Sequence, residues 1–263
     1  MWLILRHRVV YCFKNTVLKE VIKIEINKIY NEDCVSYMKK LPDECVDLII
    51  ADPPYYKTYG EFDFVYKNEE EYLEWTKEWV SESFRILKDS GGFYCWGSDK
   101  MIDKVSAFVL NKFEWEKRNL IVWNFKTGRP SKKALRNETE FMWFYSKENH
   151  LLNIDDVRIP YTNGIDHTKD KRKNPLGKSL GNVWEDSRIK QNYPEWVNHP
   201  TQKPLSICNR IVKASSNKGD LVYIPFAGSG SEIVACINNN RRWIATETNS
   251  QYINEIIIPR INS

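Results

Sequence analysis

The feature of this sequence that most constrains its fold is a regular alternation of short apolar runs with longer amphipathic segments. The apolar runs are rich in β-branched and aromatic residues and predict strands at 23–30, 46–51, 93–96, 120–123, 140–145, 221–224 and 243–246. The segments between them predict helices at 35–40, 69–88, 99–111, 204–217, 231–239 and 251–258. Because strands that alternate with helices pair in parallel through helical crossovers, we predict an α/β fold with a mostly parallel, doubly wound sheet.

Two parts of the chain fall outside this alternation. Residues 147–198 are polar, lack a periodic apolar pattern and carry turn signals such as Asn163-Gly164, so we expect an inserted, loop-rich region. Residues 1–22 form an N-terminal extension that is apolar but interrupted by charge. It is too short and too interrupted for a membrane-spanning helix, and it lacks the cleavage site of a signal peptide. A well-patterned domain begins only near Val21, so the true start codon stays open.

The tetrapeptide Asp52-Pro53-Pro54-Tyr55 directly follows the apolar run 46–51. A strand here delivers a carboxylate to its carboxyl end, and the two prolines remove two backbone donors, so the nearby carbonyls need other partners. Tyr55 adds a flat ring beside these acceptors. This combination suits a planar amine, whose two N–H groups can be bound while its ring is stacked. The alternative is an ordinary turn after a core strand, because Asp-Pro commonly opens turns.

A second chemical element is the turn from Pro225 to Gly230, which stands between a predicted strand and a predicted helix. Glycines there allow close approach of the backbone to a ligand, and the helix N-terminus offers free N–H groups. Glu247 ends the next predicted strand, where an acid can accept both hydroxyls of a ribose. The third glycine of the dinucleotide fingerprint is replaced by Ile233. The pattern therefore indicates a nucleoside-containing cofactor other than a dinucleotide.

The composition narrows the class of protein. A hydrophobic content of 42% and a charged content of 28% are ordinary for a globular chain of 263 residues. The net charge of +4 favours a polyanionic partner only weakly. The six cysteines include no C-x-x-C pair, and the four histidines are dispersed. This argues against a metal site or a disulfide framework and for a reduced, cytoplasmic protein.

Three sequence blocks in a fixed order carry a resemblance to a known family. The block Asp52 to Tyr55 comes first, His199-Pro200-Thr201-Gln202-Lys203-Pro204 precedes the helix before the glycine turn, and Phe226 to Gly230 comes last. In these blocks the sequence resembles the β group of amino-methylating DNA methyltransferases, which use S-adenosylmethionine. The resemblance covers roughly residues 23–261.

The resemblance implies a permuted Rossmann-like methyltransferase sheet, mostly parallel, with 140–145 as one antiparallel strand. Residues 23–146 would form the catalytic half, 147–198 a target-recognition insertion, and 199–263 the cofactor-binding half. The implied activity is site-specific transfer of a methyl group from S-adenosylmethionine to N6 of an adenine flipped out of double-stranded DNA. Such enzymes serve in restriction-modification systems. Whether this chain has a cognate restriction endonuclease, or forms a homodimer, the sequence leaves open.

The resemblance also implies a role for each matching residue. Asp52, Pro53, Pro54 and Tyr55 would be catalytic, with the Asp52 carboxylate and the Pro53 carbonyl accepting the amino hydrogens and Tyr55 stacking on the base. The implied contacts with the cofactor are Phe226, Gly228, Ser229 and Gly230 at its methionine part, Glu247 at its ribose, Asp33 and Cys34 at its adenine, and Thr201 and Lys203 near its carboxylate.

One departure from the family concerns the glycine turn. Family members usually carry Asp before the Pro-Phe pair and Thr-Thr after the turn, whereas this chain has Ile224 and then Ser231-Glu232. An acid near the cofactor's ammonium is therefore missing from its usual position, although Glu232 or Asp52 could replace it. A nucleic-acid-binding subunit with an impaired cofactor site stays as an alternative to an active enzyme.

Within the family, Asp at the first motif position favours adenine N6, and cytosine N4 is the alternative target. A cytosine-C5 enzyme is disfavoured, because no Pro-Cys dipeptide supplies its thiolate nucleophile. The loop 56–67 is rich in aromatic residues and either closes over the base or packs as an ordinary loop.

DNA contacts are expected from two basic stretches. The first contains no acid before Glu138, and a solvated charged loop is its alternative interpretation. Its basic residues are Lys126, Arg129, Lys132, Lys133 and Arg136. The second stretch belongs to the insertion and contains Lys169, Lys171, Arg172, Lys173 and Lys178.

Overall fold

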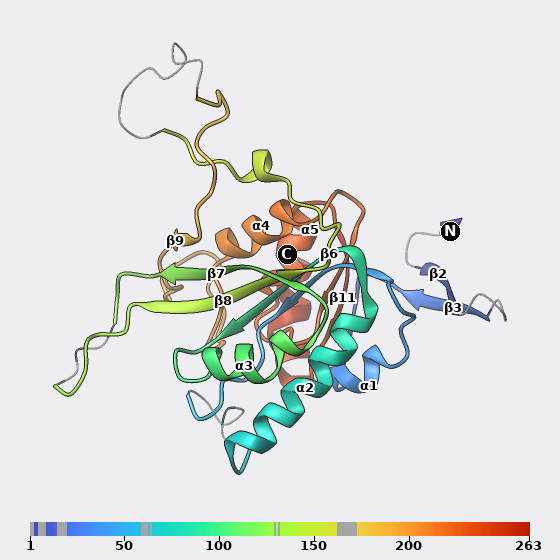
Figure 1. The fold of residues 1–263 in the computed structure, drawn as a ribbon, viewed down its shortest axis with the longest axis horizontal. Helices are drawn as coiled ribbons and strands as arrows, with labels where there is room; N and C mark the ends of the chain where they lie inside the picture. Colours follow the sequence, from blue (N-terminus) through green and yellow to red (C-terminus); the bar gives the residue numbers. More distant parts are fainter. Residues whose placement is uncertain are drawn as a thin grey trace.

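The computed structural model describes residues 3–4, 9–14, 20–58, 63, 65–128, 130, 132–161 and 173–263. Its centre is an eight-stranded sheet (Figure 1). The strands are β4 (Lys28–Tyr30), β5 (Val46–Ala51), β6 (Leu87–Gly97), β7 (Glu116–Asn124), β8 (Thr139–Ser146), β9 (Val183–Glu185), β10 (Leu221–Ile224) and β11 (Arg242–Thr246). They lie in the order β4-β11-β10-β5-β6-β8-β7-β9.

Neighbouring strands of this sheet pair in parallel except at β8, which runs antiparallel to both β6 and β7. The predicted α/β class, with a mostly parallel sheet and an antiparallel strand at 140–145, is confirmed. The antiparallel direction has a local consequence. The first residues of β8 lie at the edge of the sheet where the parallel strands end.

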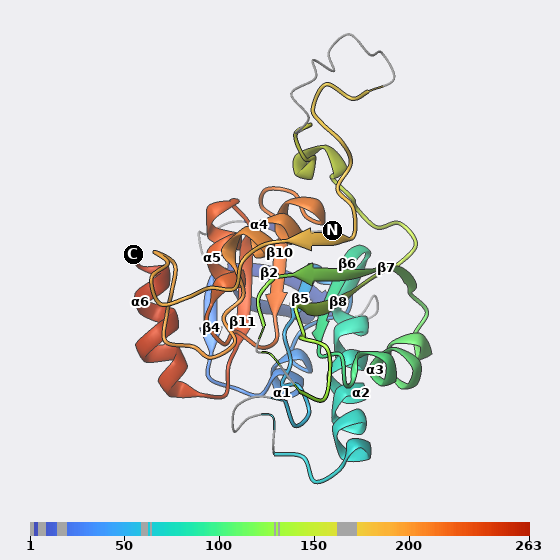
Figure 2. The same cartoon turned by 90° about the vertical axis from the view of Figure 1, so that its left-hand side faces the viewer.

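Helices cover both faces of the sheet (Figure 2). They are α1 (Cys34–Met38), α2 (Glu69–Ile86), α3 (Ile102–Phe108), α4 (Leu205–Ala214), α5 (Ser231–Asn238) and α6 (Ile258–Ile261), with short turns η2 (Leu110–Lys112), η3 (Ile154–Val157) and η5 (Tyr252–Ile257). One core cluster joins α1, α2 and α3 to the sheet, and the other joins α4, α5 and η5 to its opposite face.

Strand β5 shows why the sequence folds in this way. Its side chains alternate between the two core clusters, with Ile49 and Ala51 on the α2 face and Leu48 and Ile50 on the α4 face. All four are fully buried. A strand that is apolar on both faces is typical of the middle of a parallel sheet covered by helices.

The predicted strand 23–30 is wrong as a single element. It is divided into β3 (Glu20–Glu25) and β4, which joins the main sheet. β3 pairs with β2 (Val9–Lys14), and β2 pairs with β1 (Leu3–Ile4), in a separate small sheet. Asn27 lies at the break with a positive φ of 56°. Its backbone N–H donates to the Trp243 carbonyl, and its side-chain oxygen accepts from the Trp243 N–H, so the chain turns onto the edge of β11.

Other boundaries differ by smaller amounts. The helix predicted at 69–88 ends at Ile86, and β6 begins at the next residue. The helix predicted at 99–111 is divided into α3 and η2. The helix predicted at 251–258 begins instead as the π-helical turn η5 and continues as α6.

The described part of the region 147–198 leaves β8, forms η3 and returns as β9 at the edge of the sheet. The segment that follows η3 extends away from the sheet, and the segment that leads to β9 returns beside it (Figure 1). There Ile159 and Lys178 form an antiparallel bridge. Within the described ranges, none of the helices has the length and apolar character needed to cross a membrane.

Candidate active site

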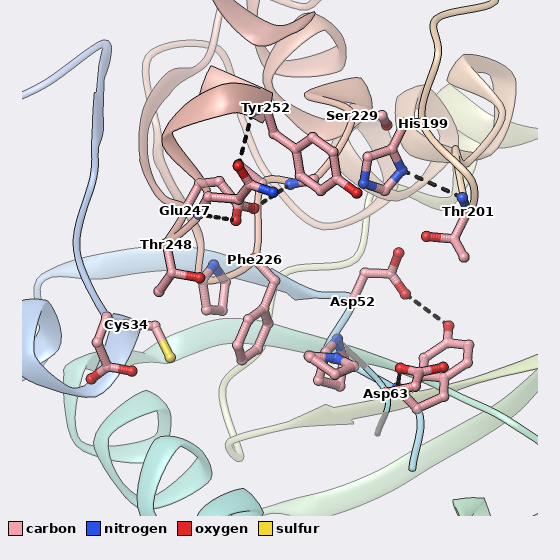
Figure 3. Close-up of a pocket in the computed structure, with 18 of the residues that line it drawn as sticks. Cys34, Asp52, Asp63, His199, Thr201, Phe226, Ser229, Glu247, Thr248 and Tyr252 are labelled. Atoms are coloured by element: carbon pink, nitrogen blue, oxygen red, sulfur yellow. Dashed lines mark hydrogen bonds between the residues drawn. The ribbon is translucent and has the colours of Figure 1, made fainter. Parts of the chain in front are cut away.

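A cavity of about 330 Å³ lies where four parallel strands end (Figure 3). Its lining includes residues that follow β4, β5, β10 and β11, among them Asp33, Asp52, Phe226 and Glu247. The helices after β4 and β5 cover one face of the sheet, and the helix after β10 covers the other. Chains that diverge in this way leave a crevice at the carboxyl ends of the strands, which is where open α/β sheets bind ligands.

The glycine turn after β10 forms one wall of the cavity. Gly228 and Gly230 have positive φ angles of 48° and 74°. A Cβ on Gly228 would come within 3.2 Å of the His199 ring, so only glycine fits closely there. The Gly228 N–H donates to Glu247 Oε2 at 2.9 Å, and the Glu247 N–H donates to the Tyr30 carbonyl at 3.0 Å. These two bonds connect the ends of β4, β10 and β11.

Aromatic and acidic side chains also line the cavity. Phe226 packs against Trp75 and Trp79 of α2, which fixes its ring beside the cavity. Asp33 lines the cavity, and its carboxylate also accepts from the Ser36 N–H at the start of α1. Cys34 is buried next to it. The predicted contact residues Asp33, Cys34, Thr201, Phe226, Gly228, Ser229 and Glu247 therefore all line one cavity, and Gly230 belongs to the same turn.

His199, from the block before α4, stands over the glycine turn. Its ring makes an edge contact with Tyr252 at 4.7 Å between centroids. Burial, and then the charges of Lys203 and Arg260, lower the pKa of His199 to about 4. The imidazole is therefore neutral at neutral pH and adds no charge to this wall.

The D-P-P-Y residues form the floor of the cavity, and their carboxylate belongs to a cluster of four side chains. Lys203 Nζ lies 2.9 Å from Asp52 Oδ2 and 2.9 Å from Glu140 Oε1. The Tyr55 hydroxyl lies 2.7 Å from Asp52 Oδ1 and 2.7 Å from Glu140 Oε1. Lys203 is only 3% exposed, so its charge is compensated inside the protein by two carboxylates.

The electrostatics of this cluster follow from its burial. Burial raises the pKa of Asp52, and the positive charge of Lys203 opposes that rise. Burial would lower the pKa of Lys203, but the charges of Asp52 and Glu140 outweigh it and the pKa is raised. Burial and the two acids raise the pKa of Tyr55 well above its usual range. Lys203 is therefore a cation and Tyr55 a protonated donor at neutral pH.

Asp63 positions the backbone of this motif. Its carboxylate accepts a short hydrogen bond from the Tyr55 N–H, and its carbonyl accepts from the Lys57 N–H at 2.8 Å. The Tyr72 hydroxyl donates to the Pro54 carbonyl at 3.0 Å. The loop 56–67 is thereby connected to the motif, although Tyr59, Phe62 and Phe64 lie outside the described residues.

The basic residues expected at DNA lie in the connection between β7 and β8, which projects beyond the sheet (Figure 1). Lys126 pairs with Glu185 at 2.7 Å, and Arg136 forms an ion pair with Glu138. Lys132 and Lys133 are exposed. Arg129 lies outside the described residues, as do Lys169, Lys171 and Arg172 of the insertion. In the described part of the insertion, Lys173 lies over the Tyr161 ring and the Lys178 backbone pairs with Ile159.

Two acids of the site were not predicted as functional from the sequence alone, and a third, Glu232, only as a replacement for a missing acid. Glu140 stands in the apolar strand β8, and a lone acid in such a run is the signal that could have identified it. Asp63 gives no such signal. Glu232, in the first turn of α5, lines the cavity and is 3% exposed. Burial, and then the Asp52 charge, raise the pKa of Glu232 to about 7.

The profile of the N6/N4 DNA methylase family matches residues 46–258. The chain is 35% identical over 240 residues to the DNA adenine methyltransferase YhdJ of Escherichia coli K12, covering 87% of this chain and 81% of that protein. It is 31% identical over 248 residues to the type II methyltransferase M.BglII of Bacillus subtilis, covering 88% and 68%.

Solved structures agree with the fold. The PvuII DNA methyltransferase, described as cytosine-N4-specific, superposes with a TM-score of 0.70 at 17% identity, over 89% of this chain and 91% of that one. The complex of M1.HpyAVI with SAM superposes with a TM-score of 0.62 at 22% identity, over 90% and 99%. The likeness therefore covers the sheet and the helices on both of its faces.

Proposed function

Because this chain belongs to the family of N6/N4 DNA methylases, we propose that it transfers a methyl group from S-adenosylmethionine to N6 of adenine in double-stranded DNA. The observation that carries this proposal is the shared cavity of the Asp52 motif and the glycine turn, which brings an amine acceptor and a nucleoside site together. The target amine is inaccessible inside a duplex, so the base must be flipped out, at a cost of roughly a few kcal/mol.

The cavity suits S-adenosylmethionine, whose positively charged sulfur makes its methyl group electrophilic. The glycine turn gives the close backbone approach that the methionine part needs, through Phe226, Gly228, Ser229 and Gly230. We propose that Glu247 binds the ribose, Asp33 and Cys34 the adenine, and Thr201 the carboxylate, because all four line the cavity. Because Lys203 Nζ is bound between Asp52 and Glu140, we assign Lys203 to the amine-binding side of the cavity.

Asp52 and the Pro53 carbonyl would accept the two N–H groups of the target amine. Each carboxylate oxygen has two acceptor positions, so Asp52 can accept an N–H while Lys203 stays bound to its Oδ2. These bonds favour a nitrogen whose lone pair is available for the methyl carbon. The C–N bond forms as the C–S bond breaks, and the electron pair of that bond stays on sulfur. Positive charge moves to nitrogen, where Asp52 stabilises it and then takes the released proton.

The choice of base is tested by product analysis. We expect DNA treated with the purified protein and S-adenosylmethionine, then digested to nucleosides, to contain N6-methyldeoxyadenosine in the mass spectrum. The Asp at the first motif position and the 35% identity to an adenine methyltransferase support adenine. If N4-methyldeoxycytidine were the only methylated product, the target base would be cytosine instead of adenine. The absence of any methylated nucleoside from every DNA tested would contradict the proposed activity.

Glu232 is proposed to bind the cofactor's ammonium in place of the acid that Ile224 replaces. Among the described residues, no cation forms an ion pair with this buried carboxylate, and the Cys208 thiol is its hydrogen-bond donor at 3.6 Å. We expect Glu232→Gln to weaken binding of S-adenosylhomocysteine about tenfold or more in calorimetry, as for loss of a hydrogen bond to a charged group.

The control ligand is 5′-methylthioadenosine, which lacks the amino-acid part and should bind both proteins equally. The pH dependence gives a second measure. Since the pKa of Glu232 is about 7, the carboxylate is ionised only above that pH, and binding to the unsubstituted protein should tighten from pH 6 to pH 8. The variant should lose this dependence, and equal binding by both proteins at pH 8 would exclude Glu232 from the role.

We propose that the connection between β7 and β8 contacts DNA phosphates through Lys126, Arg129, Lys132, Lys133 and Arg136. It continues directly into β8, whose second residue, Glu140, pairs with Lys203 of the cavity lining. Phosphate contacts of this kind position the duplex without reading its sequence. Base readout is assigned to the insertion 147–198, which we propose as the target-recognition region.

A further inference from the structure

We propose that Glu140 is a positioning residue that keeps Asp52 free to accept the target amine. It does so by accepting the hydrogen bond that the Tyr55 hydroxyl otherwise donates to Asp52. This inference rests on the proposed function, because it assigns a role in the same site. Glu140 belongs to β8, whose antiparallel direction brings the start of the strand to Lys203 and Tyr55.

The Tyr55 hydroxyl has two acceptors within reach but only one hydrogen to donate. The Tyr55 hydroxyl carries one hydrogen, yet it lies 2.7 Å from both Asp52 Oδ1 and Glu140 Oε1. It can donate to only one of them at a time. A rotation of the O–H bond changes the acceptor without moving the ring, so the ring can stay in place for a base to stack on.

The net charge of the cluster also depends on Glu140. Asp52 and Glu140 carry two negative charges, and Lys203 carries one positive charge at 2.9 Å from each. The cluster therefore has a net charge of −1 when both acids are ionised. Because these side chains are largely buried, that charge acts strongly on an amine that becomes positive during transfer. Without Glu140 the charge of Lys203 would cancel that of Asp52.

The single hydrogen of Tyr55 and the net charge of the cluster together define the proposed role of Glu140. When an amine N–H approaches Asp52 Oδ1, Tyr55 donates to Glu140 instead, and no hydrogen bond of the cluster is lost. Lys203 stays bound to both acids and fixes the Asp52 carboxylate against rotation. Lys203 also lies 4.9 Å from the Trp96 ring centroid and 5.3 Å from that of Tyr55, so its position is set by packing as well.

The test compares Glu140→Gln with the unsubstituted protein in steady-state methylation of DNA. The amide keeps the shape of the side chain but removes its charge. We expect kcat to fall roughly tenfold to a hundredfold, with the KM for DNA and the affinity for S-adenosylhomocysteine nearly unchanged. Glu116→Gln is the matched control, because Glu116 is also a strand acid paired with a cation, Arg118, at the far end of β7. It should leave kcat unchanged.

The pH profile distinguishes this role from a structural one. Asp52 is faced by Lys203, Glu140, Tyr55, Glu232 and Cys95, and among these the Glu140 charge helps to raise the pKa of Asp52. Removing that charge should move the acidic limb of the kcat profile to lower pH, while the plateau falls. A change that only disturbed packing would lower the plateau without moving the limb.

A double-mutant cycle covers the case in which Glu140→Gln folds poorly. If Glu140 acts by accepting the Tyr55 hydrogen bond, Glu140→Asp, whose shorter side chain withdraws the acceptor, should cost less in a Tyr55→Phe background than in the unsubstituted protein. Equal costs in both backgrounds, or an unchanged kcat and pH limb, would overturn the inference while the methyltransferase activity stood. An unsubstituted protein that binds S-adenosylhomocysteine but methylates no base would instead contradict the proposed function.

Discussion

Asp52→Ala is expected to reduce kcat for DNA methylation by about a thousandfold or more, which is the upper part of the range for a residue that directly contacts the reacting group. The substitution removes the proposed acceptor of the amine hydrogens and the charge proposed to stabilise the developing cation. Lys203 keeps Glu140 as a partner at 2.9 Å, so the fold should survive. The measurement is single-turnover transfer of labelled methyl groups at saturating DNA.

Binding experiments separate this loss from a general defect. The Kd values of the Asp52→Ala protein for S-adenosylhomocysteine and for DNA should stay within about threefold of the unsubstituted values, because the glycine turn and the basic connection are untouched. Asp89→Ala, which changes an exposed acid near the start of β6, is the control. Near-normal turnover by Asp52→Ala would remove Asp52 from the reaction.

Lys203→Met is expected to have the largest effect on stability. It would leave the Asp52 and Glu140 carboxylates buried and facing each other through a shared phenol, with no cation between them. Removing one partner of a buried ion pair typically costs about 3–5 kcal/mol of unfolding free energy. Urea denaturation at pH 5.5 and at pH 8 measures it.

The direction of the pH effect follows from the acids. The pKa of Asp52 is raised by burial even with Lys203 present, and it should rise further without that charge. A folded state with a raised carboxyl pKa takes up protons more readily than the unfolded state. The destabilisation should therefore be small below the ordinary carboxyl pKa, grow until the pH passes the raised Asp52 pKa of the folded state, and then level off.

Two further variants make this prediction specific. In Lys203→Met/Glu140→Gln only one carboxylate charge is left, so part of the lost stability should return. Lys147→Met is the control, because Lys147 is a largely buried lysine whose acid partner Glu44 is 64% exposed. Its loss of stability should not grow with pH. A pH-independent loss in Lys203→Met would show that its effect is packing alone.

Much of the fold was predictable because its central strands are apolar on both faces. Val46–Ala51 and Leu221–Ile224 could only be buried strands of a covered sheet, and parallel strands bring their carboxyl ends to one edge. That rule is enough to predict that Asp52 and Glu247 lie near the glycine turn. The break at Asn27 was not predictable, because the apolar alternation continues through it and only the edge of β11 determines the turn.

The acid cluster was less accessible to sequence reasoning. Glu140 lies at the beginning of its strand, and only the antiparallel direction of β8 brings that beginning to Lys203 and Tyr55. Lys203 was expected near the cofactor's carboxylate, whereas its partners come from strands far away in the sequence. Glu232 occupies the first turn of a helix, where an acid is common because it interacts favourably with the helix dipole. Its position in the sequence therefore does not indicate a functional role.

The bridge between Ile159 and Lys178 closes the excursion beyond η3 at its base. The chain leaves from β8 and returns as β9 in the same sheet, so both ends are anchored by secondary structure. A doubling of a flexible loop costs only about 0.6 kcal/mol in closure entropy. If the insertion reads the DNA bases as we propose, residues added or removed between the two anchors would change the DNA specificity while the chemistry stayed constant.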